Sequence, residues 1–140
     1  MAAIDPDEIE PGLVVFMDPA VFAADGRVSH TKDPPTSRRG PFVCVSVDHE
    51  ISEWMPITTE ERLERLAIGR EWCSGGHPQW LRDAQYLNDG ANVWRGPSEA
   101  FVDASRHELT SRSNRARVSE VGLAAIHEEA EAQSHRRDRP

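Results

Sequence analysis

A loop rich in cations is the first place where this sequence gathers side chains able to do chemistry. From residue 18 to residue 40 the apolar pattern gives way to Pro, Gly, Ser and Asp, and loops this long are usually functional or disordered. The loop contains Arg27, His30, Lys32, Arg38 and Arg39. Arginine donates forked, charge-assisted hydrogen bonds to phosphate, and histidine exchanges a proton near neutral pH. The loop therefore predicts phosphate contact, with His30 as a candidate acid or base, against the alternative of a solvated loop.

Thr58 is the second candidate. It ends a strand-like run, and Glu61 follows it by three residues, which is the pattern of a capping box. Its hydroxyl is expected either to cap a helix or to assist chemistry at a phosphate, and the two roles are compatible. For Arg38 and Arg39 the alternative role is in weak surface ion pairs.

A second basic segment runs from residue 106 to residue 117. Its four arginines begin with Arg106 and are opposed by Glu108. This pattern suits a nucleic-acid backbone or an acidic partner. The ordinary alternative is a polar connector paired with the acidic helix that follows it.

The sequence contains no pattern for metal binding, nucleotide-cofactor binding or cysteine nucleophile chemistry. The six histidines never form an i, i+4 pair or lie beside a Cys-x-x-Cys motif, so no metal is expected. A Walker or Rossmann glycine loop is lacking, and no cofactor is expected. Cys73 and His77 are close in sequence, but a reactive thiol needs a lowered pKa and an oriented base. Their spacing favours an ordinary structural cysteine.

The composition predicts one domain in the cytoplasm. A chain of 140 residues fits a single core. Its apolar stretches are shorter than the roughly 18 residues of a membrane helix, and its acidic start is unlike a signal peptide. We expect Cys44 and Cys73 to be reduced thiols. The net charge of −8 argues against indiscriminate binding to nucleic acid or membranes.

Short apolar runs between turn residues predict a β-rich fold of the α+β class. Strands are expected at Gly12–Met17, Pro41–Asp48, Ile51–Ile57, Trp80–Leu81, Val93–Trp94 and Ala100–Val102. Within the second run, Phe42, Cys44 and Ser46 alternate with Val43, Val45 and Val47, which predicts two distinct faces. The Asn-Asp-Gly sequence at residues 88–90 predicts a hairpin turn.

Helices are predicted at two places. The capping box at Thr58 leads into a short amphipathic helix that ends near Trp72, and Ser119 caps a C-terminal helix that runs to about Ala132. The domain is expected to span residues 1–134, with a flexible tail at 135–140. The four tryptophans are expected to fill the core or an oligomer interface more than to stack on bases.

Three stretches taken in order resemble the MazF/PemK toxin family. Gly12–Asp18 is similar to the opening strand of that family, Arg39–Ser46 to its Arg-Pro entry into the second strand, and Met55–Thr59 to its Pro-Ile-Thr strand end. Ser98 and the C-terminal helix match the late part of the family pattern. In this chain Gly40 separates Arg39 from Pro41, where the family places Arg directly before Pro.

The resemblance implies an SH3-like barrel with an inserted short helix and a C-terminal helix, and a homodimer. The implied function is metal-independent cleavage of single-stranded RNA by a toxin, restrained by an antitoxin protein. Arg39 or Arg38 is then the catalytic arginine, Thr58 the catalytic threonine, and His30 a proton carrier. Further RNA contacts are expected from Arg27, Lys32, Ser98 and Arg106. The alternative is a catalytically inactive barrel that binds a protein partner.

Overall fold

The chain folds around an antiparallel β-sheet that is covered on both faces. The computed structural model describes residues 4–31, 38–88 and 92–137. The strands are β1 Leu13–Met17, β2 Ser29–His30, β3 Gly40–Asp48, β4 Ile51–Thr58, β5 Ala67–Ile68, β6 Cys73–Ser74, β7 Gln85–Leu87, β8 Trp94–Pro97 and β9 Ala116–Val118. The helices are α1 Pro19–Ala23, α2 Pro78–Arg82, α3 Ser98–Ala104 and α4 Glu120–Arg137, with 3-10 turns η1 Pro6–Glu8, η2 Arg70–Trp72 and η3 Arg112–Asn114. The predicted α+β class is confirmed.

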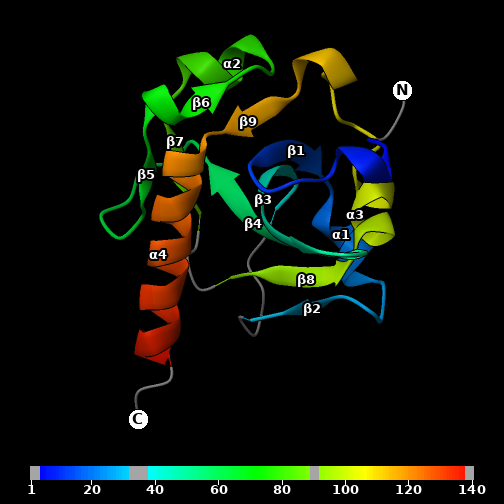
Figure 1. Ribbon diagram of the computed structural model, residues 1–140. Helices are drawn as coiled ribbons and strands as arrows, with labels where there is room; N and C mark the ends of the chain where they lie inside the picture. Colours follow the sequence, from blue (N-terminus) through cyan, green and yellow to red (C-terminus); the bar gives the residue numbers. More distant parts are fainter. Residues whose placement is uncertain (1–3, 32–37, 89–91, 138–140) are drawn as a thin grey trace.

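The strand order is β2-β8-β4-β3-β1-β9-β6, with β7 paired to β4 and β5 paired to β7 (Figure 1). The two ends of this path, β2 and β6, are not paired with each other among the described strands, so the sheet is open rather than closed into a barrel. Both β8 and β7 pair with β4, at residues 51–54 and 57–58 respectively. They therefore lie end to end along β4 and do not pair with each other as a hairpin. Residues 89 and 90 of the predicted hairpin turn lie outside the described residues.

Alternation along the central strands supplies two apolar cores. Phe42 and Cys44 of β3 belong to the first core, which α1 and α3 cover, whereas Val43 and Val45 belong to the second, which α2 and α4 cover. The two predicted faces of this strand are therefore confirmed from Phe42 to Val45, whereas the predicted place of Val47 beside Val43 and Val45 is wrong. A β-bulge between Cys44 and Ser46 then shifts the register, and Val47 packs against the first core.

The predicted helix from Thr59 to Trp72 is wrong. This segment consists of turns, the short strand β5 and the 3-10 turn η2. Leu63, which a helix would bury, is fully exposed. The backbone is used in long-range pairing instead: Leu66 accepts a hydrogen bond from Leu87, and Ile68 pairs with Gln85 of β7. Tertiary pairing therefore overrides the local helical spacing.

Two predicted strands are helices. Trp80–Leu81 lies in α2, where Pro78 occupies the first turn and the His77 side chain accepts from the Gln79 N–H as an N-cap. Ala100–Val102 lies in α3, which directly follows Pro97. Trp80, Ala100 and Phe101 are buried, whereas Leu81 is exposed. Short apolar runs like these do not distinguish a strand from one turn of a buried helix.

The predicted C-terminal helix is confirmed as α4, and the Ser119 hydroxyl accepts from the Gly122 N–H at its start. The helix continues to Arg137, so the first part of the expected tail at 135–140 is helical, and residues 138–140 lie outside the described residues. Over the part of the chain that the structure describes, no helix combines the length and apolar character needed to cross a bilayer.

Candidate functional site

The pairing of β3 with β4 brings Arg39 and Thr58 to the same end of the sheet. Phe42 lies opposite Pro56, and continuing this antiparallel register by two residues places Gly40 level with Thr58. Arg39 directly precedes Gly40. The two residues that the sequence singled out therefore lie at the same end of the sheet, although they are far apart in the chain.

Asp18 joins them from β1. The pair Met17↔Gly40 sets the end of β1 beside the start of β3, and Asp18 is the next residue along the chain. Its Oδ2 lies 2.9 Å from Nη2 of Arg39, while its Oδ1 accepts from the Ala20 N–H as the N-cap of α1. One carboxylate thus fixes both the helix start and the arginine.

Thr58 and Glu60 complete the group. The Thr58 hydroxyl accepts a 3.1 Å hydrogen bond from the Glu60 N–H, which leaves the hydroxyl proton available to donate. Arg62, bonded to Glu60, holds the pKa of that carboxyl below its ordinary value, and Arg65 and Arg38 add to the effect. Asp18, Arg38, Arg39, Thr58 and Glu60 are called the rim site below.

The segment that follows Thr58 is pinned at the rim by Arg65. Its guanidinium donates to the Glu60 carbonyl at 2.7 Å and to both the carbonyl and the side-chain oxygen of Asn88. The Tyr86 hydroxyl donates to Glu61 at 3.0 Å. The chain that was expected to form a helix is therefore an ordered loop that frames the rim site.

His30 does not belong to this group. It pairs with Trp94 of β8, which pairs with Trp54 of β4. Trp54 precedes Thr58 by about 13 Å of strand, and two strand spacings add about 10 Å sideways. The His30 ring is exposed and packs edge-on against Trp94, with ring centroids 5.1 Å apart. The structure therefore separates the expected proton carrier from the rim site.

Arg27 and Ser98 lie at the opposite end of the sheet. Ser98 donates its N–H to the Glu50 carbonyl and its hydroxyl to Ser52. Arg27 forms ion pairs with Asp25 and Glu99. The distance from Glu50 to Thr58 is the whole length of β4, so these expected RNA contacts face a different part of the surface.

Arg106 and Lys32 are the remaining residues expected to contact RNA. Arg106 is exposed on the turn after α3. The Ala104 carbonyl, two residues earlier, accepts from the Asp18 N–H at 3.0 Å, so Arg106 lies at the rim end of the sheet. Lys32 lies outside the described residues.

Asp18 and Glu60 were not singled out from the sequence. Asp18 precedes Pro19, and Asp followed by Pro is an N-cap signal that marks a helix start. That signal predicts α1 but not the ion pair with Arg39, which needs the β1–β3 register. Glu60 carries no local signal beyond its position two residues after Thr58.

The two cysteines are free, and their surroundings oppose reactivity. Burial raises the pKa of the Cys44 thiol to about 12. Burial, followed by the charge of Glu71, raises the pKa of Cys73. His77 is occupied as the N-cap of α2. Among the described residues no cluster of three His, Cys, Asp or Glu side chains is placed to hold a metal ion.

No protein-family model, curated protein or solved structure matches this chain. The resemblance to the MazF/PemK family therefore rests on the quoted sequence stretches alone.

Proposed function

We propose that this protein is a metal-independent endoribonuclease of the MazF/PemK kind that cleaves single-stranded RNA at the rim site. The observation that carries the proposal is the ion pair of Arg39 with Asp18 at 2.9 Å, at the end of the sheet where the β3–β4 register also places Thr58. An arginine, a hydroxyl donor and a carboxylate are the groups that a phosphodiester transesterification uses.

The reaction uses the 2′-hydroxyl of the RNA as nucleophile. The 2′-oxygen attacks the adjacent phosphorus, its proton passes to the Asp18 carboxylate, and the bond from phosphorus to the 5′-oxygen breaks. The leaving oxygen takes a proton from water, which gives a 2′,3′-cyclic phosphate and a 5′-hydroxyl. Arg39 and the Thr58 hydroxyl donate to the phosphate oxygens as negative charge builds on them.

The wider parts of the proposal follow from the resemblance. They are an SH3-like arrangement of the strands, a homodimer, and an antitoxin protein as the restraining partner. Arg38 and Arg106 are two further cations at this end of the sheet, and they extend the contact along the RNA backbone. Each added phosphate contact strengthens the salt dependence of binding.

One observation favours a second candidate, a non-catalytic module that binds a protein partner. Arg39 is paired with Asp18, and Arg62 is paired with Glu60. A surface on which arginines already have carboxylate partners attracts phosphate less strongly. Growth arrest on expression that disappears in Arg39→Ala contradicts this second candidate.

The test is incubation of the purified protein with single-stranded RNA in a metal chelator. The proposal predicts fragments that end in 2′,3′-cyclic phosphate, with a rate that falls by about 100- to 1,000-fold in Arg39→Ala, as for other lost transition-state donors. Arg27→Ala is the matched control, because Arg27 is also exposed and ion-paired but lies at the opposite end of the sheet. Absence of product with the wild-type protein overturns the proposal.

A further inference from the structure

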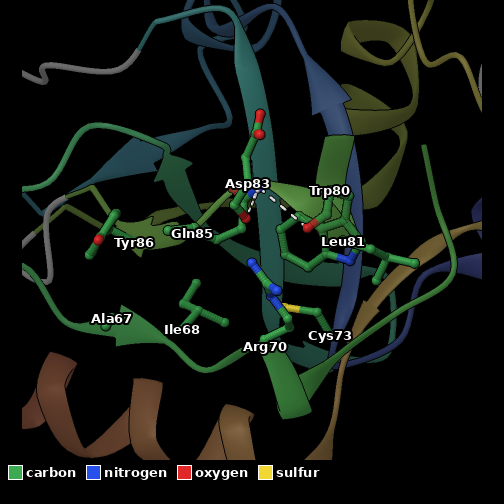
Figure 2. Close-up of a pocket in the computed structure, with 10 residues that line it drawn as sticks. Ala67, Ile68, Arg70, Cys73, Trp80, Leu81, Asp83, Gln85 and Tyr86 are labelled. Carbon is green, nitrogen blue, oxygen red and sulfur yellow. Dashed lines mark hydrogen bonds between the residues drawn. The ribbon is translucent and has the colours of Figure 1, made fainter. Parts of the chain in front are cut away.

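The loop that follows Thr58 carries the chain from one side of β7 to the other. Thr58 at the end of β4 and Ala67 at the start of β5 both pair with Tyr86 of β7. Ala67 and Tyr86 lie opposite each other at the edge of a small cavity (Figure 2). Both outer strands are antiparallel to β7 and therefore parallel to each other, so the chain between them has to return along the strands. Residues 59–66 form this return, and they begin inside the rim site.

Arg65 ties the two arms of this loop together. Its Nη1 donates to the Glu60 carbonyl at 2.7 Å, and its Nε and Nη2 donate to the backbone carbonyl and the side-chain oxygen of Asn88 at 3.0 and 2.7 Å. Asn88 is itself fixed, because its N–H donates to the Pro56 carbonyl of β4 at 2.9 Å. The Arg65 side chain is only 15% exposed. The guanidinium therefore fastens Glu60 to the residue that follows β7.

Glu60 passes this constraint on to Thr58. The Glu60 N–H donates to Thr58 Oγ1 at 3.1 Å, while the Glu60 carbonyl accepts from Arg65. The backbone of Thr58 is already held by its pairing with β7, so the Glu60 N–H acts on the hydroxyl alone. A hydroxyl oxygen that accepts one N–H still has its own proton to donate. The bond therefore favours the state of Thr58 in which the proton is left for a phosphate oxygen.

Arg62 provides a contrast within the same loop. It also bonds to Glu60, but its Nε and Nη2 donate to the side-chain carboxylate, at 3.2 and 2.9 Å. Its side chain is 64% exposed. Arg62 therefore acts on the charge of Glu60, whereas Arg65 holds the Glu60 backbone.

We propose that Arg65 is a positioning residue of the rim site, which holds the Glu60 peptide so that the Thr58 hydroxyl keeps its proton for the RNA phosphate. The inference rests on the proposed function, because the phosphate is that of the RNA strand cleaved there. Arg65 does not itself bind the phosphate, since its guanidinium is committed to oxygens of Glu60 and Asn88. Its loss should therefore slow the chemical step and leave RNA affinity in place.

The first measurement is the steady-state cleavage of single-stranded RNA in chelator by Arg65→Ala, with Arg62→Ala as the matched control. Arg65→Ala should lower kcat about tenfold, the effect of one weakened hydrogen bond, with KM within about twofold of the wild-type value. Arg62→Ala should leave both constants near their wild-type values. A raised KM with unchanged kcat would make Arg65 a phosphate contact and overturn the inference.

A Thr58→Val background separates positioning from a general loss of order. If Arg65 acts through Thr58, adding Arg65→Ala to Thr58→Val should slow cleavage no further. A further loss of the same size as in the wild-type background would overturn the inference. Arg65→Lys serves where Arg65→Ala does not fold, because an ammonium keeps the charge but cannot bond to all three acceptors as the planar fork does. It should show the same dependence on Thr58 with a smaller loss.

Solvent exchange of the Glu60 amide tests the contact without RNA, by NMR of the ¹⁵N-labelled full-length protein. Thr58→Val gives the exchange rate of the N–H when its acceptor is removed. Arg65→Ala should approach this faster rate, and Arg62→Ala should keep the slower wild-type rate. An unchanged rate in Arg65→Ala would mean that Arg65 does not hold Glu60, which overturns the inference.

The two measurements separate this inference from the proposed function. If the wild-type protein does not cleave RNA but Arg65→Ala speeds exchange of the Glu60 amide, the hold of Arg65 on Thr58 stands and the nuclease falls. If Arg65→Ala cleaves RNA at the wild-type rate, the positioning role is overturned and the nuclease stands.

Discussion

The Arg39 guanidinium lies 2.9 Å from the Asp18 carboxylate. Asp18 directly follows β1 and Arg39 directly precedes β3, and these two strands are paired. The pair is partly exposed, so its net stabilisation is small. In the proposed nuclease the carboxylate orients the arginine and also competes with phosphate for it. Under that proposal the pair sets both RNA affinity and the supply of a base.

Asp18→Asn separates these two effects. Asparagine is a good N-cap, so α1 keeps its start. Removing the carboxylate frees Arg39 and is expected to raise RNA affinity by up to about fivefold, the scale of one exposed ion pair. The cleavage rate should fall by about 100-fold or more, because the base is lost. Binding measured by anisotropy and cleavage measured by gel should thus move in opposite directions; equal cleavage rates would remove Asp18 from the mechanism.

Glu8 and Arg115 form a buried pair that anchors the N-terminal segment. The Glu8 carboxylate accepts from Nε and Nη2 of Arg115, and the two side chains are 3% and 6% exposed. Glu8→Ala leaves the arginine buried and unpaired, which should lower the free energy of unfolding by about 3–5 kcal/mol. Arg112→Ala breaks only exposed pairs to Asp5 and Asp7 and should cost at most about 1 kcal/mol. Urea unfolding curves compare the two variants.

The same pair predicts a loss of stability in acid. The hydrogen bond from Arg115 is the largest cause of the lowered pKa of Glu8 in the folded protein. A lowered folded pKa contributes stability that is fully present above the unfolded pKa of about 4.5 and is lost as the pH falls through the folded pKa. The free energy of unfolding should therefore drop as the pH is lowered below about 4.5. In Glu8→Gln this drop should be smaller, and an unchanged slope would mean that Glu8 does not contribute to it.

The positions of Arg39 and Thr58 were predictable because a hairpin fixes its own register. The alternation of Phe42, Val43 and Cys44 identified β3, and the predicted turn after this strand, which the structure forms at His49 and Glu50, brought β4 beside it. The same reasoning failed after Thr58, where Leu63, Leu66 and Ala67 have helical spacing but the segment pairs with β7 through Ala67 and Ile68. That pairing depends on residues about twenty positions away, and no local pattern reveals it.

The site itself was predictable only in part. Arginine and threonine could be chosen by residue type, and the start of β3 and the end of β4 brought them together. The place of Asp18 depends on contacts between β1 and β3, which cross the chain. His30 was wrongly grouped with Arg39 because both lie in the same predicted loop. In the structure His30 belongs to β2, which pairs with β8 and lies away from Arg39.

The cysteines offer a check on the packing of the sheet. Cys44 is fully buried, with a thiol pKa raised to about 12, and Cys73 is half-buried. A thiol reagent should modify Cys73 slowly, at a rate that still rises with pH above about 8.5, the ordinary thiol pKa. Cys44 should react only when the protein unfolds. Mass spectrometry of the folded protein that finds Cys44 modified first would contradict this packing.

The most direct test of the central claim is a double-mutant cycle of RNA cleavage with Arg39→Ala, Thr58→Val and the combined variant. If both side chains act on one phosphate group, their effects on the cleavage rate are coupled. The combined variant should then cleave RNA about as fast as the slower single variant, and much faster than if the two losses multiplied. If the two losses simply multiply, or if neither single variant changes the rate, Arg39 and Thr58 do not work together on the RNA backbone.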